Sequence, residues 1–190
     1  MQNQSVSQMS IPHSTVPCRA VRVTRTGLSA GDAGIYETVE WMRRLIREST
    51  PHPAIRRHTE RAVEGLPPGQ PLEEIRAVYE YVANITDYRR DPYDVEQLVA
   101  PWSVLECTVD QGRRPQLDCD DLTMLSLSML GSIGFPTVIR VVSTRQDGQY
   151  NHVYGLAEVG EYLVPLDLTR ARQDPDAPRR PEMRAFEVPV

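Results

Sequence analysis

The amino-acid sequence predicts an α+β fold in which helices come first and an antiparallel sheet follows. In several segments between residues 35 and 134, apolar side chains recur every three or four positions, which is the spacing of one face of an α-helix. After Pro136 the chain is rich in β-branched residues, which favour strands. Gly160-Glu161 interrupts this second part and is typical of the tight turn between two antiparallel strands.

Three helices are expected before the central part of the chain. The first begins near Ile35 and ends before Pro51, because proline cannot continue a helix. A mostly polar second helix is expected over residues 54–64, and a third over residues 72–84, where apolar side chains form one stripe. Residues 88–114 are expected to be mostly loop.

The strongest helix prediction covers residues 120–134, which are apolar around much of the helix circumference. Such a helix is expected to be buried, and Gly134 with the Phe-Pro pair after it predicts its end. Three strands are then expected, at residues 137–143, 152–159 and 162–169.

The length of 190 residues is sufficient for one domain with a hydrophobic core, which we expect over residues 35–169. Residues 1–34 lack a core pattern and are expected to form an extended N-terminal arm, with a short strand at residues 20–24. Residues 170–190 are rich in Pro, Arg and Asp and are expected to form an extended C-terminal tail.

The composition argues against several classes of protein. A net charge of −5 and a pI of about 5.4 do not provide a basic surface, so we expect no nucleic-acid partner. No apolar run approaches the ~20 residues that span a bilayer, and the polar N-terminus lacks the apolar segment of a signal peptide. Three cysteines are too few for a disulfide framework, and we expect Cys107 to be an incidental buried thiol.

Cys119 lies at the start of the predicted buried helix, with Asp118 as the expected N-cap. The partial positive charge of a helix N-terminus favours the thiolate, and the unpaired N–H groups there are available to an oxyanion. Asp118, Asp120 and Asp121 act in the opposite direction and raise the pKa of the thiol, unless a cation such as an imidazolium compensates them. Alternatively, Cys119 is only a small buried apolar side chain.

A second set of chemical groups lies on the expected hairpin. With Gly160-Glu161 as the turn, Asp167 lies opposite Tyr154. His152 shares a face with Tyr154, so His152 and Asp167 are diagonal neighbours about 7–8 Å apart at the backbone. A carboxylate at this position can fix the tautomer of a histidine and stabilise its imidazolium. Alternatively, His152 is only a solvated residue at a strand edge.

Two segments of this chain resemble the core motif of the transglutaminase-like superfamily: LDCDDLTMLSLSMLGSIGFPTVIRVVS and NHVYGLAEVGEYLVPLDLT. The superfamily has a papain-like cysteine peptidase fold, so the resemblance implies N-terminal helices and a catalytic helix packed on an antiparallel sheet. It also implies that Cys119 is the nucleophile, His152 the base and Asp167 the residue that orients the base. The similarity covers about Leu72–Thr169, and DCDD with Pro-Trp upstream is similar to the branch found in phage and prophage genomes.

The same resemblance suggests residues for the oxyanion hole. Members of the superfamily often complete the oxyanion hole with an upstream aromatic or amide side chain. Trp102 is the first candidate, through its indole N–H, and Gln97 is the second. Alternatively, Trp102 only packs in the core. Asp120, Asp121 and Tyr154 are candidates for substrate binding, with the aspartates suited to an amine or guanidinium; alternatively, the two aspartates only complement the helix dipole.

The proposed chemistry requires no cofactor and no metal, and we expect neither. A metal site that combines Cys119, the neighbouring aspartates and His152 is a less favoured alternative, because thiolate, carboxylate and imidazole groups are all metal ligands. The cysteine spacing itself matches no zinc-finger pattern.

Three functions are consistent with these residues. The first is a cysteine-dependent amide-bond hydrolase or acyl transferase, similar to a peptidase or amidase, that acts on a peptide or protein. The second is a structural or assembly protein of a phage particle, which uses the fold as a scaffold and binds other phage proteins through its two tails. The third is an inactive module that binds an extended peptide. The expected location is the bacterial cytoplasm or a phage virion.

Overall fold

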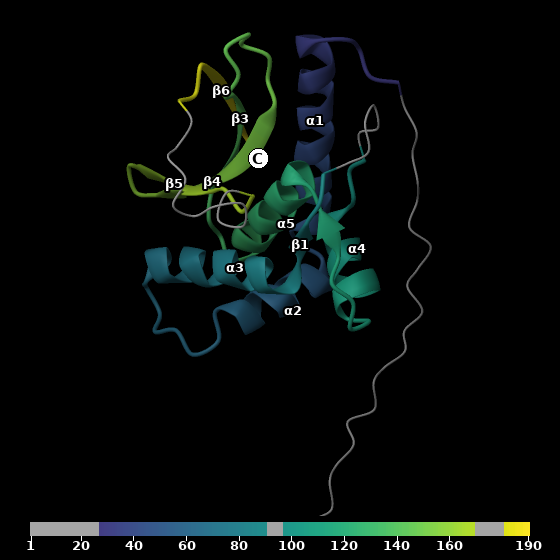
Figure 1. Cartoon of the computed structure of the whole chain (residues 1–190). Coiled ribbons are helices and arrows are strands. Elements are labelled where there is room, and N and C mark those ends of the chain that lie inside the picture. The colour runs from purple at the N-terminus through teal and green to yellow at the C-terminus, as the bar shows by residue number, and fades with distance from the viewer. Residues whose placement is uncertain (1–26, 91–96, 170–180) are drawn as a thin grey trace, which may run out of the picture.

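The computed structural model describes residues 27–90, 97–169 and 181–190. Helix α5 lies at the centre, with the sheet on one side and the other helices around it (Figure 1). The strand expected at residues 20–24 lies outside the described residues. Among the described helices, none is both long and apolar enough to cross a membrane.

The first three helices follow the predicted order. They are α1 (Asp32–Ser49), α2 (Pro53–Ala62) and α3 (Pro71–Ile85). Helix α1 begins three residues before Ile35, in the segment predicted as part of the arm. Asp32 favours this earlier start because a carboxylate in the first turn complements the helix dipole. Pro53 begins α2 at a position where its missing N–H costs no hydrogen bond.

The prediction of loop over residues 88–114 is wrong for its central part. Helix α4 (Pro101–Val104) runs directly into a π-helical turn, η1 (Leu105–Val109). Val104 and Leu105 are 3% and 0% exposed, so burial against the other helices stabilises these short segments. Segments this short contain too few turns for a sequence periodicity to reveal them.

The predicted buried helix is confirmed as α5 (Cys119–Ser132), in which every residue from Asp120 to Leu130 is buried. Its apolar side chains occupy the centre of the hydrophobic core, between the helices and the sheet. The helix ends at Ser132, two residues before the predicted bound, and Gly134 follows its C-cap with a φ of 94°, a conformation that glycine adopts without steric cost.

The sheet has four antiparallel strands in the order β5-β4-β3-β6. The strands are β3 (Thr137–Ser143), β4 (His152–Val159), β5 (Tyr162–Leu166) and β6 (Arg184–Pro189). Val159 pairs with Tyr162, which confirms the hairpin turn predicted at Gly160-Glu161. The prediction that a helix packs on an antiparallel sheet is also confirmed, since α5 packs against β4.

The prediction of an extended C-terminal tail is wrong for Arg184–Pro189. These residues form β6, which pairs with β3 along its length, as in the pair between Val141 and Phe186. Arg140 of β3 reinforces this pairing through ion pairs with Glu182 and Glu187. The strand is short and mostly exposed, so its stability comes from long-range pairing rather than from its own sequence. Residues 170–180 lie outside the described part of the chain.

Candidate active site

Cys119 is the first residue of α5, and Asp118 is its N-cap, as the sequence predicts. Oδ1 of Asp118 accepts hydrogen bonds from the N–H groups of Asp120 and Asp121, each at 3.2 Å. Two of the helix-start N–H groups that an oxyanion could use are therefore occupied by the cap. Asp118 itself is only 8% exposed, so the side chain that caps the helix is buried.

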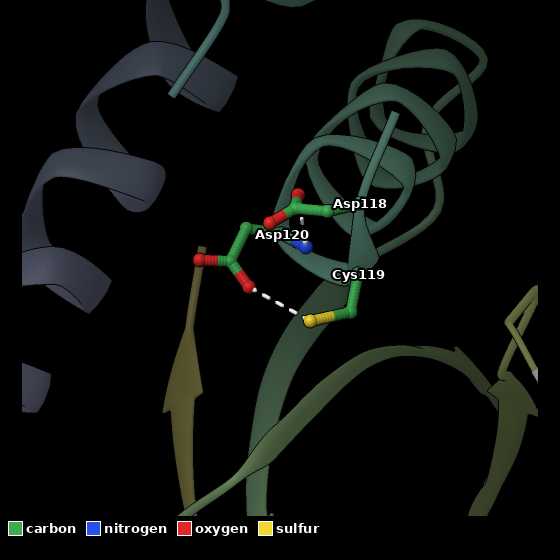
Figure 2. Close-up of side chains that lie close together, drawn as sticks. All are labelled: Asp118, Cys119 and Asp120. Carbon is green, nitrogen blue, oxygen red and sulfur yellow. Dashed lines mark hydrogen bonds between the residues drawn. The ribbon is translucent and has the colours of Figure 1, made fainter. Parts of the chain in front are cut away.

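The thiol of Cys119 faces a carboxylate. Its Sγ donates a hydrogen bond to Oδ1 of Asp120 at 3.1 Å, and the two side chains point toward each other (Figure 2). Burial raises the pKa of Cys119 well above its ordinary value, the charges of Asp120 and Asp118 raise it further, and the N–H of Val153 partly opposes them. The helix dipole alone would favour the thiolate, but these groups keep the thiol protonated.

His152 and Asp167 are hydrogen-bonded, as the hairpin register predicts. Nε2 of His152 lies 3.0 Å from Oδ2 of Asp167. The hydroxyl of Thr169 donates to Oδ1 of the same carboxylate at 2.8 Å and lies 3.5 Å from Nε2. Tyr79 of α3 donates to the main-chain oxygen of Asp167 at 3.3 Å, which ties this segment to the helices.

No hydrogen bond joins Sγ of Cys119 to the ring of His152 in this structure. Instead, the sulfur contacts the main-chain N–H of Val153, the residue next to His152. Two polar contacts reach the His152 ring from the described residues, and both are at Nε2. Nδ1 is the ring nitrogen that these contacts do not involve. The structure therefore brings the predicted residues together as two pairs, Cys119 with Asp120 and His152 with Asp167, on neighbouring elements.

The two residues predicted for the oxyanion hole lie in the segment before α5. The indole ring of Trp102, on α4, stacks on His52 with the ring centroids 4.8 Å apart and packs against the core. No hydrogen bond joins its N–H to Cys119. Gln97 is exposed in the connection before α4. An oxyanion role for either side chain stays a prediction.

The residues predicted to bind substrate make contacts within the protein. Asp121 is 5% exposed, and its Oδ1 accepts from the N–H of Val99 at 2.8 Å, so it anchors the segment before α4. Tyr154 donates to Oε1 of Glu182 at 2.8 Å, and burial with this bond raises the pKa of Tyr154 to about 12. Substrate binding by Asp120, Asp121 or Tyr154 stays a prediction.

The structure adds two side chains to the surroundings of Cys119. Strand β1 (Asp87–Tyr88) pairs in parallel with β2 (Gln116–Leu117), which sets Tyr88 beside Leu117, just before the helix start. Arg90 donates to the hydroxyl of Tyr88 at 3.4 Å. Burial raises the pKa of Tyr88, the hydrogen bond to Tyr88 raises the pKa of Arg90, and negative charge at Cys119 would add a smaller increase to both. Strands of two residues have no periodicity, so the sequence offered no signal for this neighbour.

One group of side chains near the site has the chemistry of a metal ligand set. Asp118, Cys119 and Asp120 each offer one ligand atom, and these atoms lie within 4.8 Å of one another. His152 does not belong to this group. The same side chains are hydrogen-bonded, since Asp118 caps α5 and Asp120 accepts from the thiol.

Cys107 differs from its prediction. It is disulfide-bonded, so the expectation of an incidental thiol is wrong. Three cysteines do not specify a pairing from sequence, because a disulfide depends on distance in space. Among the described cysteines, Cys119 is the free thiol.

Comparisons with known proteins show a similarity to a solved structure. No protein-family model matches the chain, and no curated protein matches it. Among solved structures, the chain is similar to one described as a putative protease from Parabacteroides distasonis, with a TM-score of 0.52 and 14% sequence identity. The similarity covers 70% of this chain and 27% of that chain, so this protein spans about a quarter of the length of its structural neighbour.

At this level of identity the similarity shows the fold. The chain has a mixed α+β fold with helices and an antiparallel sheet, consistent with the papain-like and transglutaminase-like fold that its sequence predicts. The predicted fold class is confirmed. The phage-type branch of the superfamily stays a prediction.

Proposed function

We propose that this chain is a protease-like cysteine enzyme that hydrolyses or transfers the acyl group of an amide bond. Cys119 is the nucleophile, His152 the base and Asp167 the residue that orients the base. The observation that carries the proposal is the 3.0 Å hydrogen bond from Nε2 of His152 to Asp167, on the strand whose next N–H contacts the sulfur of Cys119. The similarity in fold to a putative protease supports the reaction class.

The reaction begins when Nδ1 of His152 accepts the thiol proton and Sγ bonds to the carbonyl carbon, whose oxygen becomes an oxyanion. The C–N bond then breaks, His152 returns the proton to the leaving amine, and a thioester remains on Cys119. His152 next removes a proton from water, which attacks the thioester and releases a carboxylic acid and the free thiol. An amine in place of water forms a new amide instead.

The contact between Cys119 and Asp120 defines the resting state of this site. Before attack, the sulfur must exchange Asp120 for Nδ1 of His152, because a thiol that donates to a carboxylate is not a nucleophile. Asp118 occupies two helix-start N–H groups, so the N–H of Cys119 itself is the helix-start donor proposed for the oxyanion. Trp102 and Gln97 are proposed as further donors that approach when substrate binds.

A second candidate is an inactive module that binds an extended peptide at the same place. The observation that favours it is the thiol itself, which donates to Asp120, is not hydrogen-bonded to His152, and has a raised pKa. The proposed role in a phage particle, with partner proteins bound through the chain ends, rests on the sequence resemblance alone.

The rate of Cys119 alkylation by iodoacetamide, followed by mass spectrometry across pH 5–10, separates the two candidates. For an enzyme, His152→Ala slows alkylation at pH 7 by about tenfold or more, because the thiolate loses its imidazolium partner. The matched control is His52→Ala, which removes a histidine that stacks on Trp102 and leaves the rate unchanged. A slow reaction with an apparent pKa above the unperturbed ~8.5, insensitive to His152, would favour the binding module.

A further inference from the structure

Thr169 is buried beside the proposed base, in the segment that follows β5. The residue is only 7% exposed. The hydroxyl donates to Oδ1 of Asp167 at 2.8 Å, and the same oxygen lies 3.5 Å from Nε2 of His152. Oδ2 of Asp167 lies 3.0 Å from that nitrogen. The three side chains thus close a triangle of polar contacts.

Donor and acceptor chemistry fixes the direction of each contact. An ionised carboxylate only accepts, so Nε2 of His152 carries a proton that it donates to Asp167. The single O–H of Thr169 is used on Oδ1 of Asp167, so the contact with Nε2 has the threonine oxygen as acceptor. Both neighbours favour the same tautomer, with the proton on Nε2 and a lone pair on Nδ1.

We infer that Thr169 is a positioning residue, which holds the carboxylate of Asp167 in the orientation that keeps His152 in this tautomer. The inference rests on the proposed function, because only the Nε2–H tautomer can accept the thiol proton at Nδ1. The terminal torsion of an aspartate has a broad minimum, so a second hydrogen bond is needed to fix the carboxylate plane. Without the hydroxyl, the carboxylate rotates and the imidazole proton redistributes between Nδ1 and Nε2.

The tautomer of His152 in the full chain tests this directly. Long-range proton–nitrogen NMR on ¹⁵N-labelled protein reports which ring nitrogen is protonated, with His152→Ala providing the assignment. Thr169→Val removes the hydroxyl at nearly constant volume, and Thr169→Ser retains it. Tyr79→Phe is the matched control, because it removes a hydroxyl that binds the main chain of Asp167 rather than its carboxylate.

We expect Thr169→Val to move the proton population toward Nδ1 and to slow alkylation of Cys119 at pH 7 by about tenfold, a loss typical of one hydrogen bond to a charged group. Thr169→Ser should retain the wild-type tautomer and rate. An unchanged tautomer in Thr169→Val, or an equal shift in Tyr79→Phe, would overturn the inference. If Thr169→Val does not fold, Thr169→Ala provides the same comparison.

The two proposals fail separately in this experiment, because the tautomer is measured without any reaction of the thiol. If the alkylation rate does not depend on His152 but the tautomer changes in Thr169→Val, the enzyme proposal is rejected and the positioning role of Thr169 is retained. If the alkylation rate depends on His152 but the tautomer is unchanged in Thr169→Val, the enzyme proposal is retained and the positioning role of Thr169 is rejected.

Discussion

The protonation of Cys119 is decided by a competition between neighbours within a few ångströms. The start of α5 contributes about half a positive charge, which favours the thiolate. Burial of the thiol is the largest opposing effect, because it penalises the charged thiolate, and the negative charges of Asp120 and Asp118 add to it. Burial and the carboxylates together outweigh the dipole, and the protonated thiol donates a hydrogen bond to Asp120.

Asp120→Asn should lower the pKa of Cys119, because the substitution removes a negative charge and the strongest acceptor of the thiol proton. We expect alkylation at pH 7 to become about 3- to 10-fold faster, since the thiolate fraction rises as the pKa falls. The control is Asp121→Asn, an equal change of charge one residue away, where the carboxylate contacts Val99 instead of the thiol. Equal rates for wild type and Asp120→Asn would show that Asp120 does not restrain the thiol.

The position of the site depends on how closely α5 approaches β4. A Cβ atom at Gly155 would lie 2.6 Å from Cδ2 of Leu127, whose side chain is fully buried in the core. Glycine at this point of β4 therefore permits the close packing of helix on strand. The same approach brings the N–H of Val153, two residues earlier, to the sulfur of Cys119 at the start of the helix.

Gly155→Ala should destabilise the protein by about 1–3 kcal/mol, the usual range for an overpacked core. The added methyl group forces Leu127 to move, and Leu127 is fully buried in a closely packed core. Urea unfolding followed by circular dichroism measures the change. The matched control is Gly27→Ala, where the new Cβ meets no atom within 4 Å, and a similar loss there would attribute the effect to glycine replacement in general.

Across the whole molecule, a buried polar network joins the helices that surround α5. His58 of α2 is completely buried; its Nδ1 lies 2.6 Å from the hydroxyl of Tyr81 on α3, and its Nε2 lies 3.0 Å from Asp110 after η1. Arg57 pairs with the same Asp110. The network links three segments that the sequence separates by up to 53 residues.

Stability should fall at acid pH because of His58. Burial lowers the pKa of His58 more than Asp110 raises it, so the folded protein resists protonation while the unfolded chain accepts a proton near pH 6.5. The stabilisation is complete above the unfolded pKa and is lost as the pH falls from about 6.5 to the folded pKa. His58→Gln should flatten the free energy of unfolding over pH 5–7.5, measured by urea titration. His52→Asn, at a side chain that is 31% exposed, should leave the slope intact.

Local patterns in the sequence determined a large part of this protein. Apolar periodicity placed α5, β-branched residues placed β3, and the Gly160-Glu161 turn fixed the register that brings His152 to Asp167. These features succeeded because they depend on neighbours within a few residues or within one hairpin, where geometry follows directly from the alternation of side chains.

Only the tertiary structure decided the features that depend on long-range contacts. Strand β6 exists because β3 offers it an edge, and α4 with η1 is helical because the other helices bury it. The protonation state of Cys119 likewise could not be predicted from sequence. The sequence indicates the helix dipole and the neighbouring aspartates, but not their distances from the sulfur. Electrostatic energy depends on separation and burial, so the sequence is consistent with either a thiolate or a thiol at Cys119. The 3.1 Å distance between Cys119 and Asp120, which only the structure gives, favours the thiol.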